Sequence, residues 1–230
     1  MNEKKILTYS ELDSLGRSQE INREKEDELL KEIISNIKKT MKKNNLVSLS
    51  APGIGYNKRV FCLDFSDNEI KTFINPVIVN KTELKLAREV CSSLPGKEYI
   101  LPRHYEVDII YETPSGKIKT NRFKDVASYV IQHEVDHLEG VTLEDIGLEI
   151  DDDFDSATED EKQEIITMYL ESLEKRQKIL DDEIQSDEEL RIVSDRLKFT
   201  EALASGKITF DNLEELINKD EECTTVQKLN

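Results

Sequence analysis

The chain has 230 residues and a formal net charge of −17 at pH 7. It contains no apolar run of the roughly 18 residues that a transmembrane helix needs, and its N-terminal segment lacks the apolar stretch of a secretory signal. Its three cysteines are an odd number and form no short-spaced pair, so we expect no disulfide framework. Because neither a membrane span nor a secretory signal is evident, we expect no membrane association and a cytoplasmic location.

The charge is unevenly distributed along the chain. Residues 1–150 carry 22 basic and 25 acidic side chains, whereas residues 151–230 carry 10 basic and 24 acidic ones, a net charge of −14. Such an acidic segment repels the phosphates of nucleic acids, so we expect no direct nucleic-acid binding. We expect residues 151–230 to be either a solvated extension or a binding site for a basic partner protein.

The first predicted element is a helix in residues 20–43. This segment contains neither Gly nor Pro, and its apolar residues recur at helical spacing. It begins with acidic residues and ends with lysines, which matches the helix dipole.

A series of short strands and then a second helix follow. The predicted strands are residues 47–50, 59–65, 71–80, 106–112 and 117–123. The turn T-P-S-G at residues 113–116 joins the last two strands into a hairpin. The next helix runs from about Asp125 to Leu138 and ends near Gly140. This order predicts an α+β domain over residues 1–150, with antiparallel strands packed around a central helix.

Residues 151–230 are predicted to form a separate, acidic, all-helical extension. Residues 151–161 are predicted to be a linker and a helix start. Helical spacing continues through residues 160–185, and further helices are predicted at Asp187–Ala204 and Asn212–Asn218.

The predicted central helix contains V-I-Q-H-E-V-D-H-L-E-G, residues 130–140, with two of the three histidines of the chain. Residues four apart lie on one helix face, so His133 and His137 can bind the same metal ion. Glu134 is close enough to reach a water bound to that ion. At this composition the pattern H-E-x-x-H is expected by chance about 0.005 times, which disfavours the alternative of two surface histidines on a solvated helix.

Three segments resemble the three sequence motifs of the peptide deformylases. Q-H-E-V-D-H-L-E-G (132–140) matches the third motif, Q-H-E-x-D-H-L-x-G, at every specified position. E-V-C-S-S-L-P-G (89–96) is similar to the second motif, usually E-G-C-L-S followed by L-P-G. L-S-A-P-G-I-G (49–55) resembles the end of the first motif, usually G-V-G-L-A-A-P-Q-I-G. The order and spacing agree over roughly residues 5–148.

The resemblance implies a metal-dependent hydrolase that removes the N-terminal formyl group from formyl-methionyl nascent polypeptides. It implies Cys91, His133 and His137 as metal ligands and Glu134 as the general acid/base. A thiolate and two imidazoles suit a soft or borderline divalent ion, and the resemblance favours Fe(II), with Zn or Ni as alternatives. The expected partners are the peptide substrate and, for the acidic extension, the ribosome or a basic protein.

Three polar residues beside these motifs are expected to support the ligands. We expect Glu89 and Arg103 to form a buried pair under the second motif. We hypothesise that Asp136 orients one of the ligand imidazoles, as carboxylates around metal sites often do.

The chain departs from the family pattern on the substrate side of the site. Gly53 stands where the family has a glutamine whose amide donates to the oxyanion, and loss of one such donor typically costs about 10²–10³ in rate. Val90 replaces a glycine, and Ser92 replaces a leucine, although the backbone N–H of Ser92 can still serve as a donor. The family glycines of the first motif fall at Leu46 and Ser48.

These departures leave three interpretations open. The chain is a divergent deformylase with reduced activity or with a donor supplied elsewhere, or a metallo-amidase with a different substrate. The third interpretation is a metal-containing protein with little turnover that binds a partner through its acidic helices. Retention of Glu134 favours a hydrolase, because a structural metal site has no use for a general base, whereas Gly53 favours the third interpretation.

Overall fold

The computed structural model describes residues 4–65 and 70–184 of the chain. The chain divides into two compact units, Met1–Lys175 and Arg176–Asn230, and the elements discussed below belong to the first unit, apart from the end of the last helix. The helices are α1 (Tyr9–Asp13), α2 (Arg23–Asn44), the 3₁₀ turn η1 (Pro52–Ile54), α3 (Asp125–Glu139), α4 (Leu143–Ile146), α5 (Asp152–Ser156) and α6 (Glu159–Ile184). The strands are β1 (Ser48–Ser50), β2 (Val60–Asp64), β3 (Ile70–Lys81), β4 (Leu84–Glu89), β5 (Glu98–His104), β6 (Glu106–Glu112), β7 (Ile118–Lys124) and β8 (Leu148–Ile150).

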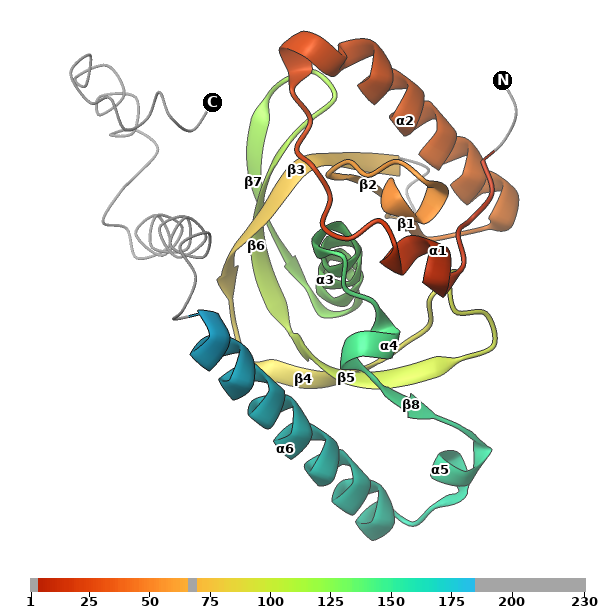
Figure 1. Cartoon of the computed structure of the whole chain (residues 1–230), viewed down its shortest axis with the longest axis vertical. Coiled ribbons are helices and arrows are strands. Elements are labelled where there is room, and N and C mark those ends of the chain that lie inside the picture. The colour runs from red at the N-terminus through yellow and green to blue at the C-terminus, as the bar shows by residue number, and fades with distance from the viewer. Residues whose placement is uncertain (1–3, 66–69, 185–230) are drawn as a thin grey trace, which may run out of the picture. The chain divides into compact units, whose positions relative to one another are not determined.

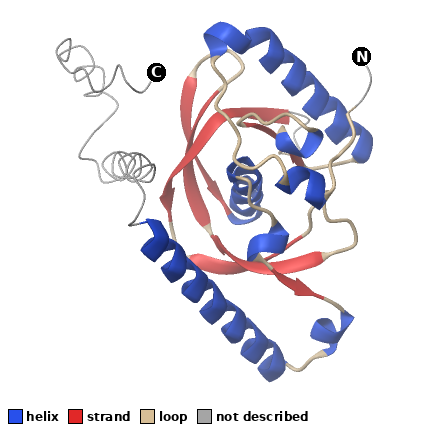
Figure 2. Cartoon of the chain, in the orientation of Figure 1, coloured by secondary structure: helices blue, strands red, loops and turns tan. Residues whose placement is uncertain are grey.

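Two antiparallel sheets surround α3. One has the strand order β1-β2-β3-β6-β7 and the other the order β4-β5-β8. Figures 1 and 2 show the strands curving around α3, which lies in the middle of the domain. The predicted α+β fold, with antiparallel strands around a central helix, is therefore confirmed.

Helix α2 covers β1 and β2 with its apolar face. Asn22 caps its start by accepting a hydrogen bond from the Lys25 N–H, and Asn45 ends it in the left-handed conformation, with φ 53°. The side chains of this interface recur every three or four residues along α2, as the sequence predicted. The buried core here consists of Leu30, Ile33, Ile37, Met41, Leu49, Val60 and Cys62, among others.

Helix α3 is held inside the domain by apolar contacts along its length and by a tight fit at its C-terminal end. Ile131 and Leu138 are fully buried among aromatic and aliphatic side chains of β2, β3 and β6. Gly140 ends the helix with φ 77°, and a Cβ at this position would lie 2.7 Å from the carbonyl carbon of Gly16. Only glycine fits both the positive φ and this close approach.

The second sheet was not predicted from the sequence. Strand β5 contains Pro102, which lacks an N–H for pairing and argues against a strand, yet Pro102 pairs with Leu86 of β4. In strand β4 the alternation of apolar and charged residues breaks after Leu86, and both Leu84 and Leu86 are exposed, so its pattern does not resemble a buried strand. Strand β8 is too short to give a pattern.

The first part of the extension packs against the domain. Helix α6 confirms the helix predicted at residues 160–185, and α5 lies within the segment that was predicted to be a linker. Tyr169 of α6 is buried in the cluster that contains Tyr99, Leu143 and Cys91, and its hydroxyl donates to the carbonyl oxygen of Ile146. The boundary predicted after residue 150 stays a prediction, and the helices predicted at Asp187–Ala204 and Asn212–Asn218 lie outside the described residues.

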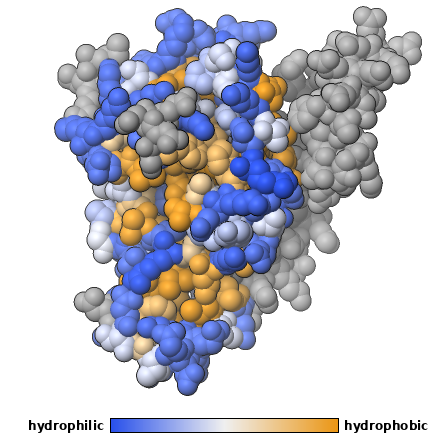
Figure 3. Space-filling model, turned by 180° about the vertical axis from the view of Figure 1, so that it is seen from behind, coloured by the Kyte–Doolittle hydropathy of each residue, from blue (hydrophilic) through white to orange (hydrophobic). Residues whose placement is uncertain are grey.

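Apolar side chains also reach the surface. Figure 3 shows them interspersed among hydrophilic residues on the face seen from behind. Val77 and Ile118 of the larger sheet and Met168 of α6 are among the exposed large apolar side chains of the described residues. Single exposed apolar residues are normal on globular proteins and need no functional explanation. No helix in the described part of the chain is long and apolar enough to cross a membrane.

We predict that the variant Tyr169→Ala lowers the free energy of unfolding by about 3 kcal/mol, because it removes a buried aromatic ring from the cluster around Tyr99. Tyr169→Phe keeps the ring, loses the hydrogen bond to Ile146 and should cost about 1 kcal/mol. Urea unfolding of the full chain measures both. Equal stability of Tyr169→Ala and the parent would show that α6 contributes nothing to the core.

Candidate metal centre

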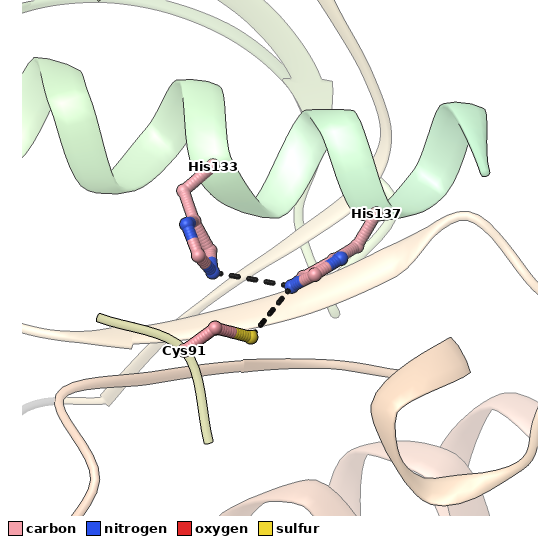
Figure 4. Close-up of side chains that lie close together, drawn as sticks. All are labelled: Cys91, His133 and His137. Carbon is pink, nitrogen blue, oxygen red and sulfur yellow. Dashed lines mark hydrogen bonds between the residues drawn. The ribbon is translucent and has the colours of Figure 1, made fainter. Parts of the chain in front are cut away.

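The three predicted metal ligands come together from two segments of the chain. His133 and His137 lie one turn apart on α3, with ring centroids 4.6 Å apart and ring planes at 86°. Cys91 follows the end of β4 and is buried. Figure 4 shows the two imidazoles projecting from α3 toward the Cys91 sulfur. The helical spacing and the motif resemblance therefore point to residues that are neighbours in space.

Their donor atoms form a compact group. His137 Nε2 lies 3.4 Å from Cys91 Sγ and 3.1 Å from His133 Nε2, and the ligand atoms all lie within 4.8 Å of one another. This arrangement allows a single ion to be bound by all three. One sulfur and two imidazole nitrogens form a typical donor set for a borderline divalent metal, and three protein ligands leave a further position open for water or substrate.

A buried ion-pair network orients His133. The Glu89 carboxylate lies 2.9 Å from His133 Nδ1 and accepts hydrogen bonds of 2.8 and 3.0 Å from Arg103 of β5. The predicted pair of Glu89 and Arg103 is confirmed. Burial raises the pKa of Glu89, but His133 and Arg103 outweigh it and lower this pKa to about 2. The ionised Glu89 favours a proton on Nδ1 of His133, which leaves Nε2 free to bind a metal ion.

The hypothesis that Asp136 orients a ligand imidazole is wrong. Asp136 Oδ2 instead accepts a hydrogen bond of 2.5 Å from Arg103, and Glu89 contacts the imidazole of His133. Asp136 directly precedes His137, so helical geometry turns its side chain about 100° away from that ligand. Asp136 therefore acts on the site only through Arg103.

The two histidines differ in protonation. Burial, and then the charge of His133, lower the pKa of His137 well below its ordinary value, so its imidazole is neutral. Burial also lowers the pKa of His133, but the Cys91 sulfur and Glu89 outweigh it and raise this pKa to about 10. Binding of a metal ion at Nε2 would displace the proton there, because only the neutral ring is a ligand.

Glu134 lies beside the ligands and is only 3% exposed. Burial raises its pKa, although His133 and the hydroxyl of Ser48 act in the opposite direction. The Ser48 hydroxyl donates to Oε1 at 2.5 Å, whereas Oε2 is buried and has no hydrogen-bond partner. A buried carboxylate oxygen without a partner is uncommon in proteins and fits a group that meets a water or substrate atom in the site.

The predicted oxyanion residues lie in two loops. Gly53 is buried in η1, and its carbonyl oxygen accepts a hydrogen bond from the Leu7 N–H. Ser92 directly follows Cys91 in a turn and is exposed, as is Val90 on the other side of that ligand. The roles of Gly53 and Ser92 in the site stay predictions.

Nothing in the sequence indicates a contact between Ser48 and Glu134. In the sequence, Ser48 is only a departure from a family glycine. Its contact with Glu134 joins β1 to α3, 86 positions apart in the chain. The one available signal was the spacing of Ser48 and Ser50, which puts two hydroxyls on one face of a strand.

The three grouped ligands and the buried glutamate beside them define the site of a metal-dependent hydrolase. Residues 3–147 match the family model of polypeptide deformylase, and the chain therefore belongs to the peptide deformylase family. Members of this family are hydrolases that remove the formyl group from nascent peptides.

Individual relatives agree with this assignment. A peptide deformylase of Dictyoglomus turgidum is 37% identical over 126 residues, which cover 55% of this chain and 82% of the relative. The peptide deformylase of Pseudothermotoga lettingae is 36% identical over 135 residues, covering 58% of this chain and 78% of the relative. The crystal structure of the Thermotoga maritima enzyme superposes with a TM-score of 0.58 at 29% identity, covering 63% of this chain and 97% of that chain.

We predict that Glu89→Gln weakens zinc binding by about 10- to 100-fold, because it removes the negative charge that orients His133 and pairs with Arg103. The matched variant Asp136→Asn also removes a carboxylate from Arg103 but touches no ligand, and it should have a smaller effect. Competition with a chromophoric chelator measures both affinities, and circular dichroism checks that both variants fold. Equal losses in the two variants would contradict the role assigned to Glu89.

Proposed function

We propose that this chain removes the formyl group from the N-terminal formyl-methionine of nascent polypeptides. The observation that carries the proposal is the buried Glu134, one residue from the ligand His133 and with one carboxylate oxygen lacking a partner. A general base in this place is of use to a hydrolase and of none to a structural metal site. We place the reaction in the cytoplasm, with the formyl-methionyl peptide as the substrate.

Cys91, His133 and His137 would hold one divalent ion, for which Fe(II) is our first choice and Zn or Ni the alternatives. When bound, such an ion polarises the formyl carbonyl and lowers the pKa of a water molecule. The protein's own part is to keep both imidazoles in the right state: Glu89 fixes the Nδ1 proton of His133, and burial keeps His137 neutral.

Glu134 moves the proton in this reaction. It takes a proton from the attacking water as the new C–O bond forms, and it delivers that proton to the departing nitrogen as the C–N bond breaks. The products are formate and a peptide with a free amino terminus. Burial raises the pKa of Glu134, so its carboxylate accepts a proton more readily than an exposed carboxylate does.

The backbone N–H of Ser92 is proposed to donate to the formyl oxygen as negative charge develops on it. Gly53 offers no side-chain donor for the same oxygen. We propose that the acidic extension binds a basic protein, and that at the ribosome such a protein would bring the enzyme near its substrate.

We predict that Glu134→Gln lowers kcat for a short formyl-methionyl peptide by at least about 10²-fold, because the amide cannot carry the proton. The full chain is loaded anaerobically with Fe(II), and formate release is measured. The variant should still bind one metal ion per chain, because all three ligands remain. Equal rates in the parent and the variant would rule out the proposed function. Turnover of an acetylated peptide in preference to the formylated one would instead favour a metallo-amidase with a changed substrate.

We predict that Gly53→Gln raises kcat by about 10-fold or more, because it restores a side-chain donor to the developing oxyanion. A Cβ at this position would lie 3.1 Å from Leu49 Cδ1, so the end of the Leu49 side chain must move slightly. Gly53→Met has similar length but no donor, and it should bring no gain. The same rate in both variants would show that position 53 does not face the oxyanion.

A further inference from the structure

Strand β1 places two hydroxyl groups beside the general base. Ser48 and Ser50 are two residues apart on the strand, so both side chains lie on the same face. Leu49, between them, points the other way and packs into the core under α2. Strand β1 packs against α3, and Ser48 reaches Glu134 directly, so the face with the two serines is the one toward α3.

The two hydroxyls match the two oxygens of the Glu134 carboxylate. Ser48 Oγ already donates to Oε1 at 2.5 Å. Ser50 Oγ and Glu134 Oε2 are both buried without a partner within hydrogen-bond distance, yet Ser50 lies close enough to Glu134 for its hydroxyl to lower the pKa of that carboxyl group. Two unpaired polar atoms in one buried place are rare, and a donor and an acceptor of this kind can satisfy each other after a small side-chain rotation.

The serines are also placed where this chain differs from the family. The first motif quoted above has Gly, Ala and Gln at the positions of Ser48, Ser50 and Gly53. Ser50 Oγ lies 3.7 Å from the place that a Cβ of residue 53 would take. The chain therefore lacks the amide at position 53 and has the Ser50 hydroxyl in the adjoining space.

We propose that Ser48 and Ser50 are positioning residues that hold the Glu134 carboxylate by both of its oxygens, Ser48 on Oε1 and Ser50 on Oε2. The inference rests on the proposed function only in taking Glu134 as the base. Each carboxylate oxygen has two lone pairs, so Oε2 can accept from Ser50 and still meet the attacking water. Fixing the carboxylate in the orientation for proton transfer acts on the chemical step rather than on substrate binding.

The test compares the parent with a double variant that carries both Ser48→Ala and Ser50→Ala. Both proteins are measured as the metal-loaded full chain. We expect kcat for a formyl-methionyl peptide to fall about 10-fold with KM unchanged, the lower end of the effect of partners that orient a site residue. Ser48→Thr keeps the hydroxyl and should stay close to the parent. Ser18 has another buried hydroxyl without a partner and belongs to a loop outside the site, so Ser18→Ala is the control and should change neither constant.

A second readout does not depend on turnover. In the zinc-loaded chain with ¹³C-labelled glutamate, the Glu134 carboxyl resonance is identified by its loss in Glu134→Gln. It should shift in the double serine variant and stay in place in Ser18→Ala. Ser48→Ala and Ser50→Ala are also measured singly, so the test still stands if the double variant does not fold.

The two proposals can fail separately. No turnover by the parent would remove the proposed function, and the carboxyl resonance would then decide the role of the serines by itself. An unchanged resonance in the serine variants overturns that role. A loss of kcat in Ser48→Thr as large as in Ser48→Ala does so too, because the shape of the side chain and not its hydroxyl would then be responsible.

Discussion

The guanidinium group of Arg103 is the point at which the metal centre is joined to the fold. It is buried and paired with Glu89 at the end of β4 and with Asp136 on α3, so one side chain of β5 links the two segments that carry the ligands. A buried charge is tolerated only when it is paired and hydrogen-bonded. Glu89 meets this requirement and contacts His133, and Cys91 is only two residues further on. The same ion pair therefore sets the distance between the sulfur and the two imidazoles.

The central position of α3 determines the polarity of the surroundings of the site. A helix surrounded by strands is expected to be apolar, yet Gln132, Glu134 and His137 of α3 are all buried. Gln132 is accounted for by hydrogen bonds to the backbone of His104. The other two polar residues belong to the site, which needs an environment that excludes water and strengthens electrostatic interactions. The fold thus supplies the low-polarity surroundings through the aromatic and aliphatic side chains packed along the rest of the helix.

Local patterns in the sequence predicted α2, α3, the hairpin of β6 and β7, and the start of the extension helix. The same local spacing brought His133 and His137 together, and motif resemblance added Cys91. What could not be predicted depends on pairing between distant segments. Strand β5 could not be predicted because it contains Pro102, which lacks an N–H for strand pairing. Nothing nearby in the chain indicates that this missing N–H is tolerated. The choice of Glu89 rather than Asp136 as the partner of His133, and the contact of Ser48 with Glu134, follow from the way the sheets wrap α3.

Tyr169 belongs to the folded core of this chain but lies beyond the segment that matches the family model. The match to the family ends at residue 147, whereas the core cluster that contains Cys91 is closed by a side chain 22 positions later, counted from residue 147 to residue 169. The segment that matches the family model and the segment that completes this core are therefore different lengths. A fragment cut after residue 147 would contain all three predicted ligands. It would lack Tyr169, so the apolar cluster around Cys91 would be left partly uncovered.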